Sequence, residues 1–216
     1  MRRWKIAAPL AALVLAAALY LAGGNPSLPN RQQAGNPEVV PAPPELRIPE
    51  KEGIVPRGFI KGEVIKVIDG DTVDVSYKNK RYKVRLLCID TPESNKRGVP
   101  VQPYAKEASE YTSRQVLHKT VTLVFDRGLK DKYDRLLAYV LFGRNGFLNA
   151  MLVKNGYARA EILKPNNSLE KYFYSLQEDA IKGKRGCWGL QEGKRPFVRG
   201  SGGTYVPGYW LDRDAS

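Results

Sequence analysis

Histidine and cysteine are scarce in this chain, whose 216 residues contain one His and two Cys. Because His118 is the single His, a histidine pair for metal binding is excluded. A Ser–His nucleophile is not expected either, because His118 lies at the expected end of a surface helix. The cysteines, Cys88 and Cys187, lack metal-ligand spacing. A bridge between them in an exported domain and two buried free thiols both remain open.

Acidic residues are the minority charge, with 22 Asp and Glu against 35 Lys and Arg. The formal net charge is +13 and the sequence pI is about 9.7. Such a balance favours polyanionic partners, either nucleic acid or an anionic membrane surface, and charge alone does not choose between them.

A long apolar run occurs only near the start, from residue 6 to 22, after the basic residues Arg2 and Arg3. Residues 1–24 therefore predict a signal peptide, cut after Gly24, or a membrane anchor that stays in the bilayer. In either case the basic flank predicts that the rest of the chain is exported.

Two further segments lie outside the expected domain, which spans residues 58–189. Residues 25–57 are rich in Pro and predict an extended linker. Residues 190–216 mix basic residues with aromatics such as Tyr209 and Trp210. This tail could hold single strands, but a disordered or loosely docked terminus is the expected state.

Within the domain, alternating apolar residues predict strands and helical spacing predicts helices. The strands are expected at 61–68, 72–77, 81–89, 121–125 and 136–142. The helices are expected from 105 to 116, from 148 to 156 and from 168 to about 183.

Three charged motifs border these strands. Asp69-Gly70-Asp71 forms the turn of a hairpin, in which Gly70 is free to take a positive φ. Arg85 lies on the run that ends in 90–93, Asp-Thr-Pro-Glu, and 131–135 reads Asp-Lys-Tyr-Asp-Arg. Carboxylates for a hard cation and for activating water, with guanidinium groups for phosphate, are what phosphodiester cleavage needs.

In this order and spacing, the motifs resemble the staphylococcal nuclease (thermonuclease) family. The matching stretches are 67–73, 85–93 and 131–139, followed by Lys-Pro-Asn-Asn at 164–167 and Gly-Cys-Trp at 186–188. The resemblance runs from about Gly62 to Gly189.

This resemblance implies an α+β fold with a five-stranded OB-fold barrel and three helices, and a Ca²⁺-dependent endonuclease. It implies the following roles: metal ligands Asp71, Asp90 and Thr91, the last through its carbonyl; an outer-shell group, Asp69; catalytic residues Arg85, Glu93 and Arg135; and substrate-binding residues Lys132 and Tyr133.

The sequence departs from the family pattern at three positions. Glu161 and Leu163 stand where the family has aromatic residues that stack on the base, so base binding is expected to be weak and to rest on basic side chains. Asp134 stands where the family commonly has Gly, and it is expected to compete for Arg135.

Two functions from different classes follow. The first is an exported or membrane-anchored endonuclease, expected as a monomer, that hydrolyses DNA and possibly RNA. It would contact the membrane through residues 1–24 if these are not removed. The alternative is a non-catalytic nucleic-acid-binding OB module at the cell surface. The presence of all the catalytic carboxylates and guanidinium groups favours the enzyme.

Overall fold

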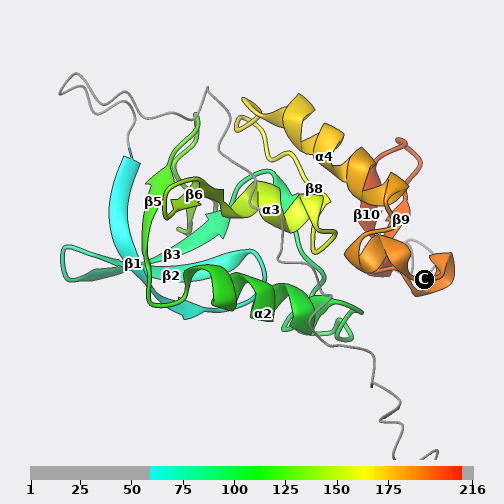
Figure 1. Ribbon diagram of the computed structural model, residues 1–216, viewed down its shortest axis with the longest axis horizontal. Coiled ribbons are helices and arrows are strands. Elements are labelled where there is room, and N and C mark those ends of the chain that lie inside the picture. The colour runs from blue at the N-terminus through cyan, green and yellow to red at the C-terminus, as the bar shows by residue number, and fades with distance from the viewer. Residues whose placement is uncertain (1–58, 211–216) are drawn as a thin grey trace, which may run out of the picture. The chain divides into compact units, whose positions relative to one another are not determined.

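Five strands close into a barrel in the computed structural model, which describes residues 59–210 (Figure 1). The barrel strands are β1 (Phe59–Val67), β2 (Thr72–Tyr77), β3 (Lys80–Leu86), β5 (Thr120–Val124) and β6 (Leu136–Phe142). Neighbours pair antiparallel in the order β3-β2-β1-β5-β6, and a parallel pairing of β3 with β6 closes the ring. A short strand, β7 (Gly146–Phe147), follows β6 and pairs antiparallel with it.

Three α-helices accompany the barrel in the described part of the chain: α2 (Ala105–Val116), α3 (Leu148–Lys154) and α4 (Glu170–Lys182). Six of the seven residues of α3 are buried, whereas α2 and α4 each bury one face. This periodicity is what apolar residues at helical spacing predict. The expected α+β class, the five-stranded barrel and the three helices are therefore confirmed.

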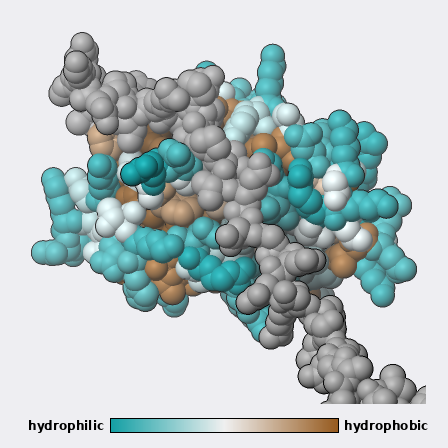
Figure 2. All heavy atoms as spheres, in the orientation of Figure 1, coloured by the Kyte–Doolittle hydropathy of each residue, from teal (hydrophilic) through white to brown (hydrophobic). Residues whose placement is uncertain are grey.

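One hydrophobic core fills the barrel and continues under α3 and α4. Within it the rings of Tyr139 and Phe173 stack, and Phe147 meets both of them edge to face. On the face shown in Figure 2, hydrophilic side chains cover most of the described surface. None of the helices between residues 59 and 210 is long and apolar enough to cross a membrane. The expected leader and linker, residues 1–57, lie outside the described residues.

The third strand is shorter than the sequence predicts. The apolar run continues to Ile89, but β3 ends at Leu86, and Cys88 adopts a positive φ of 62°. The chain then turns, and β4 (Ile89–Asp90) pairs with a different strand, β8 (Arg159–Ala160). Buried Asn149 stabilises the turn by donating from Nδ2 to the carbonyl of Leu87 at 2.9 Å. This break carries Asp90 away from the barrel sheet and toward β8.

The hairpin between β1 and β2 forms as expected, but Gly70 has a different role from the one predicted. Its φ is not positive; instead, the backbone passes close to two other elements. A Cβ at this position would lie 2.8 Å from the Cβ of Ala108 and 2.8 Å from Cγ2 of Thr91. The Gly70 carbonyl also accepts a hydrogen bond of 2.6 Å from Oγ1 of Thr112 on α2. Gly70 thus lets the hairpin, α2 and the Thr91 segment meet.

The tail after residue 189, expected to be disordered or loosely docked, is ordered in residues 190–210. These residues form two antiparallel strands, β9 (Phe197–Arg199) and β10 (Tyr205–Pro207), flanked by 3₁₀ turns at Glu192–Lys194 and Gly208–Trp210. The ring of Trp188, in the 3₁₀ turn Gly186–Gly189, packs on Phe197 and Tyr205 at centroid distances of 5.8 and 4.8 Å. Burial of these rings offsets the entropy that ordering the tail costs.

Both cysteines are free and buried, so the bridge between Cys88 and Cys187 is not formed. Burial raises the pKa of Cys88 to about 11 and that of Cys187 to about 12. Both side chains therefore remain protonated, unreactive thiols near neutral pH.

Gly70→Ala should destabilise the domain, because the added methyl group meets atoms of Ala108 and Thr91 at 2.8 Å. Overpacking of this kind costs about 1–3 kcal/mol, measured as the free energy of unfolding in urea. Gly193→Ala is the matched control, because a Cβ there meets nothing within 4 Å, and its effect should stay below about 1 kcal/mol. Equal stability of Gly70→Ala and the parent would contradict this account of the hairpin.

Candidate active site

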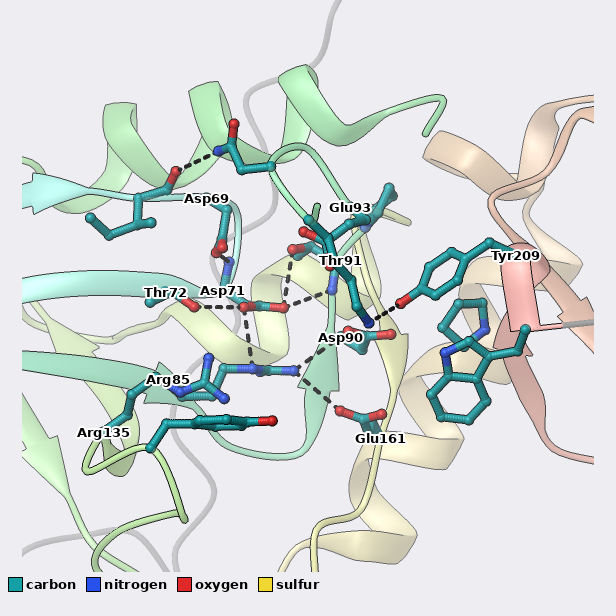
Figure 3. A pocket seen from close by; sticks show the side chains of 17 residues that line it. Asp69, Asp71, Thr72, Arg85, Asp90, Thr91, Glu93, Arg135, Glu161 and Tyr209 are labelled. Carbon is teal, nitrogen blue, oxygen red and sulfur yellow. Dashed lines mark hydrogen bonds and ion pairs between the residues drawn. The ribbon is translucent and has the colours of Figure 1, made fainter. Parts of the chain in front are cut away.

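One pocket of about 470 Å³ gathers most of the residues that the sequence singles out (Figure 3). The β1–β2 turn, β3, the segment after β4, the loop before β6, the residue after β8 and the C-terminal segment all contribute to it. Its lining residues are Ile68, Asp69, Asp71, Thr72, Arg85, Asp90, Thr91, Pro92, Glu93, Asn95, Lys96, Tyr133, Arg135, Glu161, Pro207, Tyr209 and Trp210.

Arg85 lies at the centre of the acidic side of the pocket and is 6% exposed. Its Nη1 donates to the carbonyls of Leu86 and Ile89, both at 2.7 Å. Its Nε lies 3.3 Å from Asp71, and its Nη2 lies 3.5 Å from Asp90 and 3.2 Å from Glu161. One guanidinium therefore contacts carboxylates from three separate parts of the chain.

Asp71 fixes the position of the Thr91 segment. Its Oδ2 accepts hydrogen bonds from the backbone N and the Oγ1 of Thr91, at 2.9 and 3.1 Å, and its Oδ1 accepts one from Thr72. Asp69 in turn accepts a hydrogen bond of 3.1 Å from the backbone N of Asp71. The predicted metal ligands Asp71, Asp90 and Thr91, with Asp69 beside them, are thus brought together.

A second buried arginine, Arg159, is a site residue that the sequence reasoning missed. It is 5% exposed, does not line the pocket, and lies behind Asp90 and Glu161. Its Nε donates to Asp90 at 2.8 Å, and its Nη2 donates to Glu161. The pairing of Asp90 with Arg159 across β4 and β8 creates this contact. The sequence feature that could have indicated this residue is its place between two alanines, in a short segment whose other residues are buried.

The structure shows what surrounds the three residues that depart from the family pattern. Glu161 does not stand alone where the family has an aromatic residue, because Arg85 and Arg159 both pair with it. Leu163 does not line the pocket. Asp134 takes a positive φ of 62° and pairs with Lys130 at 2.6 Å, whereas Arg135 pairs with Asp131 at 2.7 Å. The expected competition of Asp134 for Arg135 is therefore wrong.

Glu93 lies at the mouth of the pocket, on the loop that follows Thr91 (Figure 3). Its backbone N donates to Oε1 of Gln102 at 2.8 Å, and its carbonyl accepts from the backbone N of Gln102 at 2.9 Å. These two bonds anchor the main chain of Glu93.

The loop before β6 brings Arg135 and Tyr133 to the pocket, but it does not bring Lys132 to the lining. Tyr133 is 68% exposed, with the Arg135 guanidinium 5.5 Å and the Lys132 ammonium 5.1 Å from the centre of its ring. The predicted substrate-binding pair therefore forms an exposed cationic edge beside the pocket.

The inner site holds an excess of negative charge. Four carboxylates, those of Asp69, Asp71, Asp90 and Glu161, face two guanidinium groups, which leaves two unbalanced negative charges when all are ionised. Burial and the charge of Asp71 raise the pKa of Asp69, and burial and the charge of Glu161 raise that of Asp90. Burial alone would lower the pKa of Arg85, but the surrounding carboxylates raise it.

These residues fit a divalent cation. Between residues 59 and 210, no three His, Cys, Asp or Glu side chains are grouped closely enough to hold a metal by themselves. The candidate set is two carboxylates, Asp71 and Asp90, with the carbonyl of Thr91. All its donors are oxygens, as hard cations prefer, and two positive charges would balance the excess.

The chain is similar to one family model and to several known proteins. The family model described as "Staphylococcal nuclease homologue" matches residues 83–189. The chain is 43% identical over 126 residues to a thermonuclease of Staphylococcus hyicus, covering 58% of this chain and 74% of the relative. It is 41% identical over 132 residues to a thermonuclease of Staphylococcus intermedius, covering 60% and 78%. It is 32% identical over 194 residues to endonuclease YncB of Bacillus subtilis (strain 168), covering 85% and 92%.

Arg159→Met should destabilise the domain by about 3–5 kcal/mol, because it leaves Asp90 and Glu161 partly buried without this partner. Urea denaturation measures the loss, and the double variant Arg159→Met with Glu161→Gln should lose less. Lys106→Met is the control, because its partner Glu110 is 3.7 Å away on the surface and such pairs contribute about 0–1 kcal/mol. If Arg159→Met and Lys106→Met were equally stable, Arg159 would not balance the charge of the inner site.

Proposed function

The chain belongs to the staphylococcal nuclease family and is a nuclease that hydrolyses phosphodiester bonds; from this premise we propose a Ca²⁺-dependent endonuclease that cleaves DNA, and RNA as a second substrate. The observation that carries the proposal is the convergence of Asp71, Asp90 and Glu161 on Arg85 in a pocket whose mouth holds Glu93. The non-catalytic alternative has no comparable support.

In the proposed reaction, water attacks the phosphorus, the bond from phosphorus to the leaving oxygen breaks, and the leaving oxygen takes up a proton from solvent. Glu93 takes the proton of the attacking water or orients that water. Arg85 and Arg135 hold the phosphate and stabilise the charge that develops on its oxygens. On Arg85, Nη1 is bonded to the carbonyls of Leu86 and Ile89, so a phosphate would have to share Nη2 with Glu161 and Asp90, which already contact it.

Asp71, Asp90 and the carbonyl of Thr91 would hold the cation, with Asp69 in its outer shell. When bound, the cation would polarise a phosphate oxygen and offset the negative charge of the inner site. Ca²⁺ accepts irregular oxygen coordination more readily than Mg²⁺, which supports calcium as the working ion.

Cleavage of plasmid DNA by the purified chain tests the proposal. We expect cleavage with calcium, no cleavage with excess chelator, and little with magnesium, because magnesium demands near-ideal octahedral geometry. Recovery on adding calcium back is the control for protein damage. Undiminished cleavage in chelator would refute the metal requirement.

Glu93→Gln should lower turnover by about 10²–10⁴, because it removes the proton acceptor and keeps the size of the side chain. Arg135→Lys keeps the charge but loses the two-donor fork, and should lower turnover by about 10²–10³. Glu107→Gln, on the exposed face of α2, is the control and should cleave like the parent. A folded Glu93→Gln chain that cleaves at the parent rate would show that the base lies elsewhere.

The proposed place of action is outside the cytoplasm, at the membrane surface or released from it. The basic start and apolar run of residues 1–24 and the Pro-rich segment 25–57 support export. Fractionation of cells should recover the protein with membranes or outside the cell. Full-length protein in the soluble cytosol would be the opposite result.

A further inference from the structure

The C-terminal segment forms one wall of the candidate active site. Pro207, Tyr209 and Trp210 line the same pocket as Arg85 and Glu93. In Figure 3, Tyr209 comes from the C-terminal segment and lies across the pocket from Asp71 and Arg85. None of the nuclease motifs in the sequence includes these residues.

Three hydrogen bonds join the C-terminal segment, residues 190–210, to residues in or near the pocket, and one of them reaches Tyr209 itself. Nε2 of Gln102, the residue that anchors Glu93, donates to the carbonyl of Pro196 at 3.0 Å. Nη1 of Arg159, the partner of Asp90, donates to the carbonyl of Tyr205 at 2.9 Å. Nζ of Lys96 donates to the hydroxyl of Tyr209 at 2.9 Å. The aromatic wall is therefore built into the site.

The two rings differ from the aromatic residues of the core in their exposure. Trp210 is 43% exposed and Tyr209 is partly exposed, although both line a pocket whose other walls are largely charged. Cations lie over both rings, with Lys96 4.8 Å from the Tyr209 centroid and Arg159 5.9 Å from the Trp210 centroid. Flat, partly exposed rings held in place beside a phosphate-cleaving centre are suited to stack on a nucleobase.

Tyr133, the third aromatic residue of the pocket, suits a different role. It lies on the cationic edge formed with Lys132 and Arg135, both of which approach its ring. That edge suits the sugar-phosphate backbone, whereas the wall of Tyr209 and Trp210 supplies an apolar surface.

We propose that Tyr209 and Trp210 form the nucleobase subsite of this enzyme, on which the base next to the cleaved phosphate stacks. The inference rests on the proposed function, and it names the unpaired nucleotide as the unit that the pocket recognises. Stacking tolerates all four bases, so the subsite adds affinity without base specificity. It differs from the expectation that binding depends more on basic side chains than on stacking.

Binding of two oligonucleotides of the same length tests the proposal. One is single-stranded oligothymidine, and the other carries abasic residues throughout, so both have the same phosphates but only the first has bases. Fluorescence anisotropy with calcium measures both affinities, using the full chain in mild detergent with Glu93→Gln to prevent cleavage. The quantity of interest is the ratio of the two dissociation constants.

We expect the chain with both rings to bind oligothymidine about 5- to 150-fold more tightly than the abasic strand, which is the range of one base–aromatic stack. Trp210→Ala and Tyr209→Ala, singly or together, should bring this ratio toward one and leave the affinity for the abasic strand unchanged. Trp210→Phe and Tyr209→Phe keep a ring and should retain most of the ratio.

Tyr77→Ala is the matched control, because Tyr77 also lies under a lysine, 5.3 Å from Lys78 Nζ, but does not line the pocket. An unchanged ratio in the double alanine variant would overturn the inference, as would tighter binding of both strands, which would show that the rings obstruct the pocket. If the proposed function itself were wrong, the parent chain would cleave neither DNA nor RNA. This result distinguishes its failure from failure of the base subsite.

Discussion

The buried charge of Arg85 is the constraint on which the rest of the structure depends. A guanidinium that is 6% exposed needs a partner for every donor edge, because an unpaired buried charge is far costlier than a paired one. Two backbone carbonyls, Leu86 and Ile89, satisfy one edge only because the chain turns between β3 and β4. The same turn delivers Asp90 to the guanidinium. The local fold and the acidic site therefore have a common cause.

Most of the barrel could be predicted from the sequence, because short apolar runs bounded by turn residues are a local property. The ends of β2 and β6 are those expected, and α2 spans the expected residues 105–116. The break after Leu86 could not be predicted, because the apolar run continues through Cys88 to Ile89 and the bonds that impose the turn come from distant residues such as Asn149. The order of the C-terminal segment depends likewise on burial of Phe197 and Tyr205 against Trp188.

The candidate site also contains residues that the sequence could predict and residues that it could not. Residues within short motifs, such as Asp71, Asp90 and Glu93, were found because their spacing along the chain is distinctive. Arg159 was missed because its relation to Asp90 is a strand register between segments 69 residues apart. For a related reason, the sequence names Tyr209 and Trp210 in a tail that could hold single strands but does not place them in the pocket. The positions that are aromatic in the family pattern, 161 and 163, are close in sequence to the motifs, whereas Tyr209 and Trp210 reach the pocket only through tertiary contacts.

The net charge of the chain is positive, whereas the inner pocket is acidic. A chain of net charge +13 draws a polyanion from a distance. The inner pocket, by contrast, sets four carboxylates against two guanidinium groups, and it repels an entering phosphate to the extent that Asp69 and Asp90, whose pKa values are raised, are ionised. Under the proposed function, a divalent cation on Asp71 and Asp90 would offset that excess of negative charge as phosphate approaches Arg85. Arg159 cannot serve instead, because it does not line the pocket. Long-range attraction would then rest on the net charge of the chain, whereas entry of the reacting phosphate would rest on the cation.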